Sequence, residues 1–301
     1  MGRAIFGSIL ALVIAAGAAP ANTVDAARAA LAAKDNASAV ELATDALGAA
    51  NISKADATAL HVVRGQAYLA EEQYDDAIVD IGAAIDASAA PGDVCAALGD
   101  VFVIRGDANI GLRRFRDASN DFTKAVLCEP GNPAVRYKLG TAYFHFDKTN
   151  ARDAFNEAIR LKPDYLEAVI ARARNYENMR DFDKALVDYG EALRLDPGNA
   201  LTYNDRATIY SILGRLDDAL ADYNKSIELD SANFLAYLNR AYLYYRKKDY
   251  KAARMDLDYA KQLRSDPKLN EEFDKHNTPA FLKRLEADLD QLDEDLTNAP
   301  P

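Results

Sequence analysis

The chain has 301 residues, of which 50% are hydrophobic and 28% charged, so it can bury a core and is not expected to be disordered as a whole. Its formal net charge is −11, and no block rich in lysine and arginine stands out. This balance argues against nucleic acid and against an anionic membrane surface as partners.

The first 21 residues have the pattern of a secretory signal peptide. Arg3 gives a short positive start, residues 4–16 are almost all apolar, and Ala19 and Ala21 place small residues before Asn22. The apolar run is short for a helix that crosses a bilayer. We therefore expect cleavage before Asn22, a periplasmic or secreted mature chain, and no membrane attachment after cleavage.

Residues 22–57 are expected to form a degenerate helical hairpin, and residues 58–267 an array of six repeats with a period of 34 residues. In the repeat that begins at Ala200, positions 8 and 20 are small (Ala207, Ala219) and position 24 is large (Tyr223). Apolar residues spaced by three and four predict two helices per repeat, A and B. The small residues are expected where the helices cross closely, and the large residue fills the gap beside them. One repeat, near residues 132–164, has a turn that is one residue short.

The last segment, residues 268–301, is expected to hold a capping helix and a tail. A terminal repeat exposes an apolar face that needs a cap, and a narrow leucine seam at 3-4-3-4 spacing would supply it. A dimerising helix is the alternative. The seam consists of Leu282, Leu285, Leu289, Leu292 and Leu296.

Arginine at position 7 and aspartate at position 23 occur together in five repeats, and the imperfect repeat has Leu139 and Ala154 in their places. A buried guanidinium without its carboxylate costs on the order of several kcal/mol, so their joint loss indicates an ion pair between helices A and B. The alternative is a row of ligand-binding arginines. The predicted pairs are Arg64–Asp80, Arg105–Asp121, Arg172–Asp188, Arg206–Asp222 and Arg240–Asp256.

The spacing of Ala207, Tyr210, Ala219 and Tyr223, and of their counterparts in the other repeats, resembles that of the tetratricopeptide repeat (TPR) family. The resemblance implies an all-α fold, a TPR-type α-solenoid in which helical hairpins form a right-handed superhelix. It also implies that helices A line a concave groove through positions that include 5, 9 and 12. The carboxylate clamp of some TPR domains is not expected, because position 5 has no lysine and position 9 no asparagine.

Carried over to this sequence, these positions give a mixed groove with several aromatic residues and one central cation. Such a surface suits a peptide held by apolar anchors. The alternative is that some of these side chains pack on neighbouring helices or on the chain's own C-terminal segment. The candidates are Tyr137, Thr141, Phe144, Ile170, Arg174, Asn204, Leu238, Tyr242 and Tyr245.

No catalytic, metal or cofactor site is expected. His61, His145 and His276 lack metal-ligand spacing, and no nucleophile–base motif or phosphate-binding loop is present. Cys95 and Cys128 fall at the ends of a helix A and a helix B that antiparallel packing brings together. A disulfide between them suits an oxidising compartment, and two buried free thiols are the alternative.

The sequence thus predicts an exported, non-enzymatic scaffold or adaptor that binds a protein or peptide partner through the concave face. Two alternatives stay open. The chain could be a self-assembling structural protein that dimerises through the leucine seam, or an accessory subunit of an envelope enzyme or secretion complex.

Overall fold

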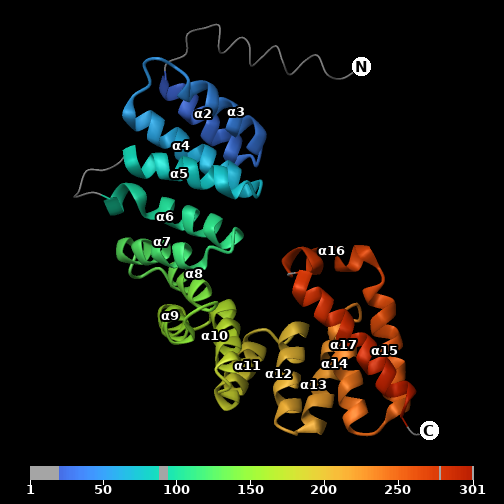
Figure 1. Ribbon diagram of the computed structural model, residues 1–301. Helices are drawn as coiled ribbons and strands as arrows, with labels where there is room; N and C mark the ends of the chain where they lie inside the picture. Colours follow the sequence, from blue (N-terminus) through green and yellow to red (C-terminus); the bar gives the residue numbers. More distant parts are fainter. Residues whose placement is uncertain (1–19, 88–93, 278, 300–301) are drawn as a thin grey trace, which may run out of the picture. The chain divides into compact units, whose positions relative to one another are not determined.

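The computed structural model describes residues 20–87, 94–277 and 279–299, and every regular element within these ranges is an α-helix (Figure 1). Residues 1–19 of the predicted signal peptide lie outside the described residues. The chain divides into two compact units, residues 1–163 and residues 164–301, which are treated separately. Unit 1 contains α2 (Pro20–Ala32), α3 (Asn36–Leu47), α4 (Lys54–Ala70), α5 (Tyr74–Ala87), α6 (Val94–Gly111), α7 (Phe115–Cys128), α8 (Pro133–Tyr143) and α9 (Lys148–Leu161). Unit 2 contains α10 (Leu166–Asn178), α11 (Phe182–Leu195), α12 (Ala200–Ile212), α13 (Leu216–Leu229), α14 (Phe234–Arg246), α15 (Tyr250–Arg264), α16 (Pro267–His276) and α17 (Pro279–Thr297).

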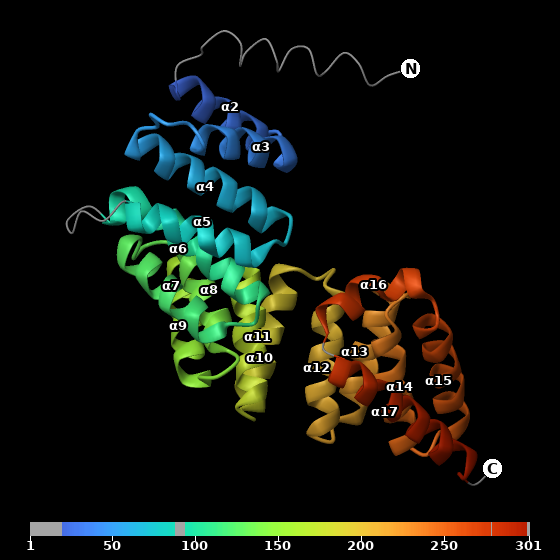
Figure 2. The same cartoon turned by 45° about the horizontal axis from the view of Figure 1, so that its top comes forward.

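Consecutive helices pair into hairpins, and within each unit every hairpin packs on the next (Figures 1 and 2). The even-numbered helices from α4 to α14 are the helices A of the six predicted repeats, and the helices that follow them are the helices B. α2 and α3 form a further hairpin ahead of them. The all-α architecture of tandem helical hairpins is therefore the one that the sequence predicts.

Helices A and B cross closely at position 8 of each repeat. A Cβ atom added to Gly140 of α8 would lie 2.5 Å from the Phe155 ring of α9, and one added to Gly106 of α6 would lie 2.5 Å from the Phe122 ring of α7. Glycine is therefore required at these positions by close approach. The large side chain at position 24 fills the space, and Phe122 and Phe155 are buried.

All five predicted Arg–Asp pairs form between helices A and B. In each pair the arginine donates from Nε and Nη2 to the two carboxylate oxygens, at distances of 2.6 to 3.0 Å. The aspartate side chains are at most 10% exposed. In the α8–α9 hairpin, Leu139 and Ala154 are buried at the equivalent positions. The arginines are thus structural, and they are not a row of ligand-binding residues.

The C-terminal segment caps the last repeat with two helices, where the sequence predicts one. Leu285, Leu289, Leu292 and Leu296 of α17 are buried in a cluster with side chains of α14 and α15. The short helix α16 precedes it, and the buried Asn270 joins the two helices of that corner, donating from Nδ2 to the backbone carbonyls of residues 263, 264 and 266. Four of the five seam leucines are therefore covered within the chain and Leu282 is partly buried, so little of the seam is left for dimerisation.

We expect Arg206→Leu to lower the free energy of unfolding by about 3 kcal/mol, because it leaves Asp222 buried without its cation. The double variant Arg206→Leu/Asp222→Leu should lose less of the free energy of unfolding than the single variant. Urea denaturation followed by circular dichroism measures both. The matched control is Arg194→Leu, whose pair with Glu191 is solvent-exposed and should matter little. A double variant as unstable as the single one would contradict the pairing argument.

Candidate functional site

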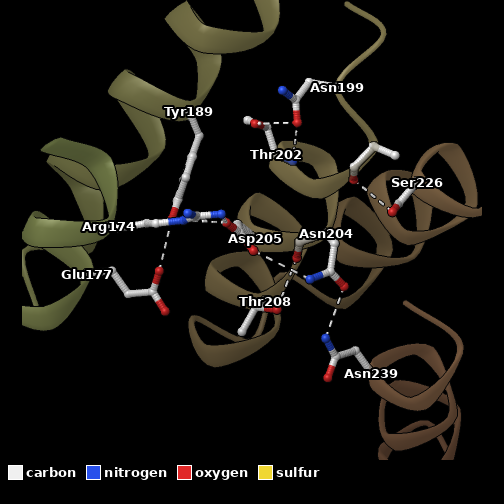
Figure 3. A network of polar contacts seen from close by, with 11 residues as sticks. Arg174, Glu177, Tyr189, Asn199, Thr202, Asn204, Asp205, Thr208, Ser226 and Asn239 are labelled. Carbon is white, nitrogen blue, oxygen red and sulfur yellow. Dashed lines mark hydrogen bonds and ion pairs between the residues drawn. The ribbon is translucent and has the colours of Figure 1, made fainter. Parts of the chain in front are cut away.

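Helices α10, α12 and α14 of unit 2 present neighbouring polar side chains, which we call the polar strip: Arg174, Glu177, Asn204, Asp205, Thr208 and Asn239 (Figure 3). Arg174 donates from Nε and Nη2 to a single oxygen of Asp205, Oδ2, at 3.0 and 2.9 Å. Asn239 donates from Nδ2 to Oδ1 of Asn204 at 3.0 Å. These bonds tie three successive helices A together along one surface.

Two tyrosines of helices B support the polar strip from beneath. The hydroxyl of Tyr189, on α11, donates to Oε2 of Glu177 at 3.0 Å (Figure 3). The hydroxyl of Tyr223, on α13, lies 3.1 Å from Oγ1 of Thr208. Both tyrosines occupy position 24 and are buried. Side chains that fill the core therefore also orient groups on the surface.

Burial sets the protonation of these groups. It raises the pKa of the Tyr223 hydroxyl to about 12, and it also raises the pKa of Tyr189. Both phenols therefore keep their protons at neutral pH. Burial raises the pKa of Glu177 above its usual value, against the opposing effect of the hydrogen bond from Tyr189.

The polar strip leaves hydrogen-bonding atoms open to a partner. Among the contacts of the described residues, Nη1 of Arg174 and Oε1 of Glu177 bond no protein group. The Arg174 side chain is 49% exposed. One surface of α10 thus offers a donor and an acceptor one helical turn apart.

A similar ion pair joins two helices A in unit 1, and the sequence interpretation missed it. Lys138 of α8 donates from Nζ to both oxygens of Asp107 on α6, at 2.7 and 3.0 Å. The two partners are 31 residues apart, as are Arg174 and Asp205. Opposite charges at this spacing are the signal that would have identified both pairs.

The nine predicted groove residues are divided between the units. Tyr137, Thr141 and Phe144 belong to unit 1, where the Tyr137 ring lies 6.0 Å from that of Phe155 and the Thr141 hydroxyl donates to the Lys138 carbonyl. The others belong to unit 2, where Ile170 is partly buried on α10. Whether the candidates that α17 does not cover line one groove stays a prediction.

At the last repeat, the predicted groove is filled by the chain itself. Leu238 is buried among the leucines of α17, and Tyr242 and Tyr245 pack against the same cluster. The Tyr242 hydroxyl donates to the backbone carbonyl of Asp288 at 2.8 Å. For Leu238 and Tyr242 the prediction of an open partner contact is therefore wrong, because α17 packs on them, which is the alternative that the sequence left open. Tyr245 is partly buried beside Tyr250 of α15.

The remaining candidates show no chemistry. His61 pairs with Asp80, His145 stacks on Phe115 at 3.7 Å, and the side chain of His276 lies outside the described residues. No group of three or more metal-ligating side chains is found within the described ranges. The helices of these same ranges include none that is long and apolar enough to span a membrane. Cys128 is disulfide-bonded, but the side chain of Cys95 is not among those described, so their pairing stays a prediction.

Comparison with known families agrees with this geometry. Tetratricopeptide repeat models match residues 24–94, 105–165, 166–199 and 189–221, and a further TPR repeat model matches residues 208–248. The chain is a tetratricopeptide repeat protein. The match to residues 166–199 has the same bounds as one predicted repeat, so the register deduced from the sequence is that of the TPR family. No curated protein matches the chain.

Solved TPR structures share the fold. A tetratricopeptide repeat protein from Parabacteroides merdae is 16% identical, with a TM-score of 0.64 over 84% of this chain and 96% of that one. MamA is 24% identical, with a TM-score of 0.51 over 56% of this chain and 94% of its own. YrrB, a TPR protein with an unusual peptide-binding site, is 18% identical, with a TM-score of 0.50 over 59% of this chain and 88% of its own. At these identities the likeness concerns the fold alone.

Glu177→Gln tests the electrostatics of this TPR surface. Because the pKa of Glu177 is raised in the folded chain, ionisation costs stability as pH rises above the ordinary glutamate value. The glutamine keeps an acceptor for Tyr189 without the charge. We expect the variant to be at least as stable as wild type at pH 8, with its relative stability falling toward pH 4.

Thermal unfolding at the two pH values measures this effect. Glu191→Gln is the control for which the opposite change of relative stability with pH is expected, because Arg194 lowers the pKa of the Glu191 carboxyl. A Glu177→Gln variant that is less stable than wild type at pH 8 and recovers at pH 4 would contradict the assignment.

Proposed function

We propose that this TPR protein is an exported, non-enzymatic scaffold or adaptor that binds a protein or peptide partner through its helices A. The observation that carries the proposal is the open donor and acceptor on α10, in a surface that the rest of the polar strip holds rigid. The peptide-binding site attributed to YrrB supports the same kind of use for a TPR surface. Fold by itself does not fix function, so the surface chemistry has to carry the proposal.

The polar strip suits a peptide because a peptide backbone carries both hydrogen-bonding partners. Nη1 of Arg174 would donate to a carbonyl or carboxylate oxygen, and Oε1 of Glu177 would accept from an N–H group. The bond from Tyr189 holds Glu177 in place, and the pair with Asp205 holds Arg174. Such preorganisation lowers the entropic cost of binding.

The family supports a role without catalysis, because TPR proteins generally act as interaction scaffolds. An accessory subunit of a larger complex would use the same surface, and the identity of its partner would define its function. Self-assembly through the leucine seam is not favoured, because α14 and α15 cover that seam.

Arg174→Ala should abolish capture of the partner. The measurement is quantitative crosslinking in the native envelope fraction, comparing wild type with Arg174→Ala and with the control Arg194→Ala, which removes an exposed arginine of helix B. We expect one partner to be captured equally by wild type and control and at least tenfold less by Arg174→Ala. Identical partner sets for all three chains would refute the use of this surface.

Export has its own test. We expect the mature chain to begin at Asn22, as intact mass and cell fractionation of the native protein will show. Ala21→Arg should leave the chain uncleaved, because the residue before the cleavage site has to be small. An uncleaved wild-type chain in the cytosolic fraction would exclude export.

A further inference from the structure

Unit 1 contains a groove on its helices A that lies outside the polar strip. It is formed by α2, α4 and α6, with α4 packed against both of the others (Figures 1 and 2). Its volume is about 540 Å³, within the usual range for binding pockets. Its lining includes Arg28, Leu31, Ala59, Val62, Gln66 and Asp100.

The groove is hollow because small side chains line it. Ala32, Ala55 and Ala59 contribute only methyl groups, and Val62 and Val63 are short. Ala55 lies in an additional first turn, since α4 has 17 residues where α14 has 13. The result is a largely apolar floor that the described lining residues leave open.

The last repeat shows what covers the equivalent surface. Positions 2, 5 and 9 of that repeat are Leu235, Leu238 and Tyr242, and they pack against the leucines of α17. The same positions in α4 are Ala59, Val62 and Gln66. In the last repeat, α17 thus covers positions 2, 5 and 9 of helix A, and the same positions of α4 are left open. The leucines of α17 face inward and its acidic residues face outward.

We propose that the groove between α2, α4 and α6 binds an amphipathic helix of a partner protein, with leucine-type side chains at three- and four-residue spacing. Because the side chains of α4 are smaller than those of α14, the partner helix can place bulkier side chains against α4 than α17 places against α14. Gln66 sits among the apolar residues and provides one hydrogen-bonding group. This site is independent of the polar strip.

Charge defines the flanks of the bound helix. Arg28 lies on the α2 wall, where its side chain is 59% exposed and only loosely paired with Asp25 at 3.8 Å. Asp100 lies on the α6 wall. Because α4 separates the two walls, the partner helix carries an acidic edge toward α2 and a basic edge toward α6.

The probe is a labelled peptide with the sequence of Pro279–Thr297 in which Asp288→Lys and Asp295→Lys create one basic edge. Fluorescence anisotropy measures its binding to the full chain. We expect saturable binding to wild type and a dissociation constant at least tenfold higher for Ala59→Phe, which fills the groove. The control Ala221→Phe, at an exposed site of α13, should match wild type. Arg28→Glu should weaken binding about threefold, and less at high salt.

A second measurement keeps the proposal testable if Ala59→Phe does not fold. The photo-crosslinking amino acid p-benzoylphenylalanine placed at Gln66 should capture the peptide, whereas the same group at the exposed Asn120 should not. Arg174→Ala should leave binding of this peptide unchanged. Failure of the groove proposal and failure of the proposed function of the polar strip therefore give different results.

Three outcomes would overturn the proposal. The first is the absence of saturable binding to wild type. The second is binding that Ala59→Phe leaves intact, which would place the peptide elsewhere, for example by exchange with α17. The third is equal binding of a peptide that also carries Asp290→Pro, because proline breaks the helix and the groove would then take an extended segment.

Discussion

The repeats of this TPR protein share one close crossing between helices A and B, where a small residue of helix A lies against a larger side chain of helix B. In unit 1 the crossing pairs Gly106 with Phe122 and Gly140 with Phe155. In unit 2 the α10–α11 and α12–α13 hairpins pair an alanine with a tyrosine, and the α14–α15 hairpin has Ala241 and Leu257 at these positions. The crossing fixes the distance between the helices, and the Arg–Asp pair, 16 residues apart in sequence, forms beside it.

Two of the crossings in unit 2 have a tyrosine where two in unit 1 have a phenylalanine. The hydroxyl groups of Tyr189 and Tyr223 reach side chains of helix A, so the core of unit 2 orients its polar strip. Phe122 and Phe155 have no hydroxyl group. The α4–α5 crossing pairs Gly65 with Ile81. The helix-A surface of unit 1 includes the hollow over α4, lined by small side chains, and the Lys138–Asp107 pair.

The sequence predicts those features that follow from periodicity. Helix pairing, the small and large residues at the crossing, the five ion pairs and the capping role of α17 all depend on which residues share a helix face. The missed features depend on three-dimensional volume or on contacts between distant helices. The hollow over α4 arises from alanines contributed by two helices. The sequence leaves the coverage of Leu238 open as an alternative, because it depends on where α17 lies. α16 is short, and its corner is held by side-chain bonds of Asn270 that have no periodic signature.

The ion pairs have identical chemistry and spacing, and this matters for the fidelity of folding. Charge alone cannot distinguish the correct helix B from that of another hairpin, which is the characteristic hazard of repeat chains. The crossing supplies part of the distinction, because the Phe122 ring occupies the space in which a Cβ atom at position 106 would lie. The α8–α9 hairpin adds a second safeguard. Leu139 and Ala154 carry no charge, so exchanging either helix with an ion-paired hairpin would bury a lone charge. Mispairing of this hairpin with an ion-paired one is therefore disfavoured by the unpaired charge that it would bury.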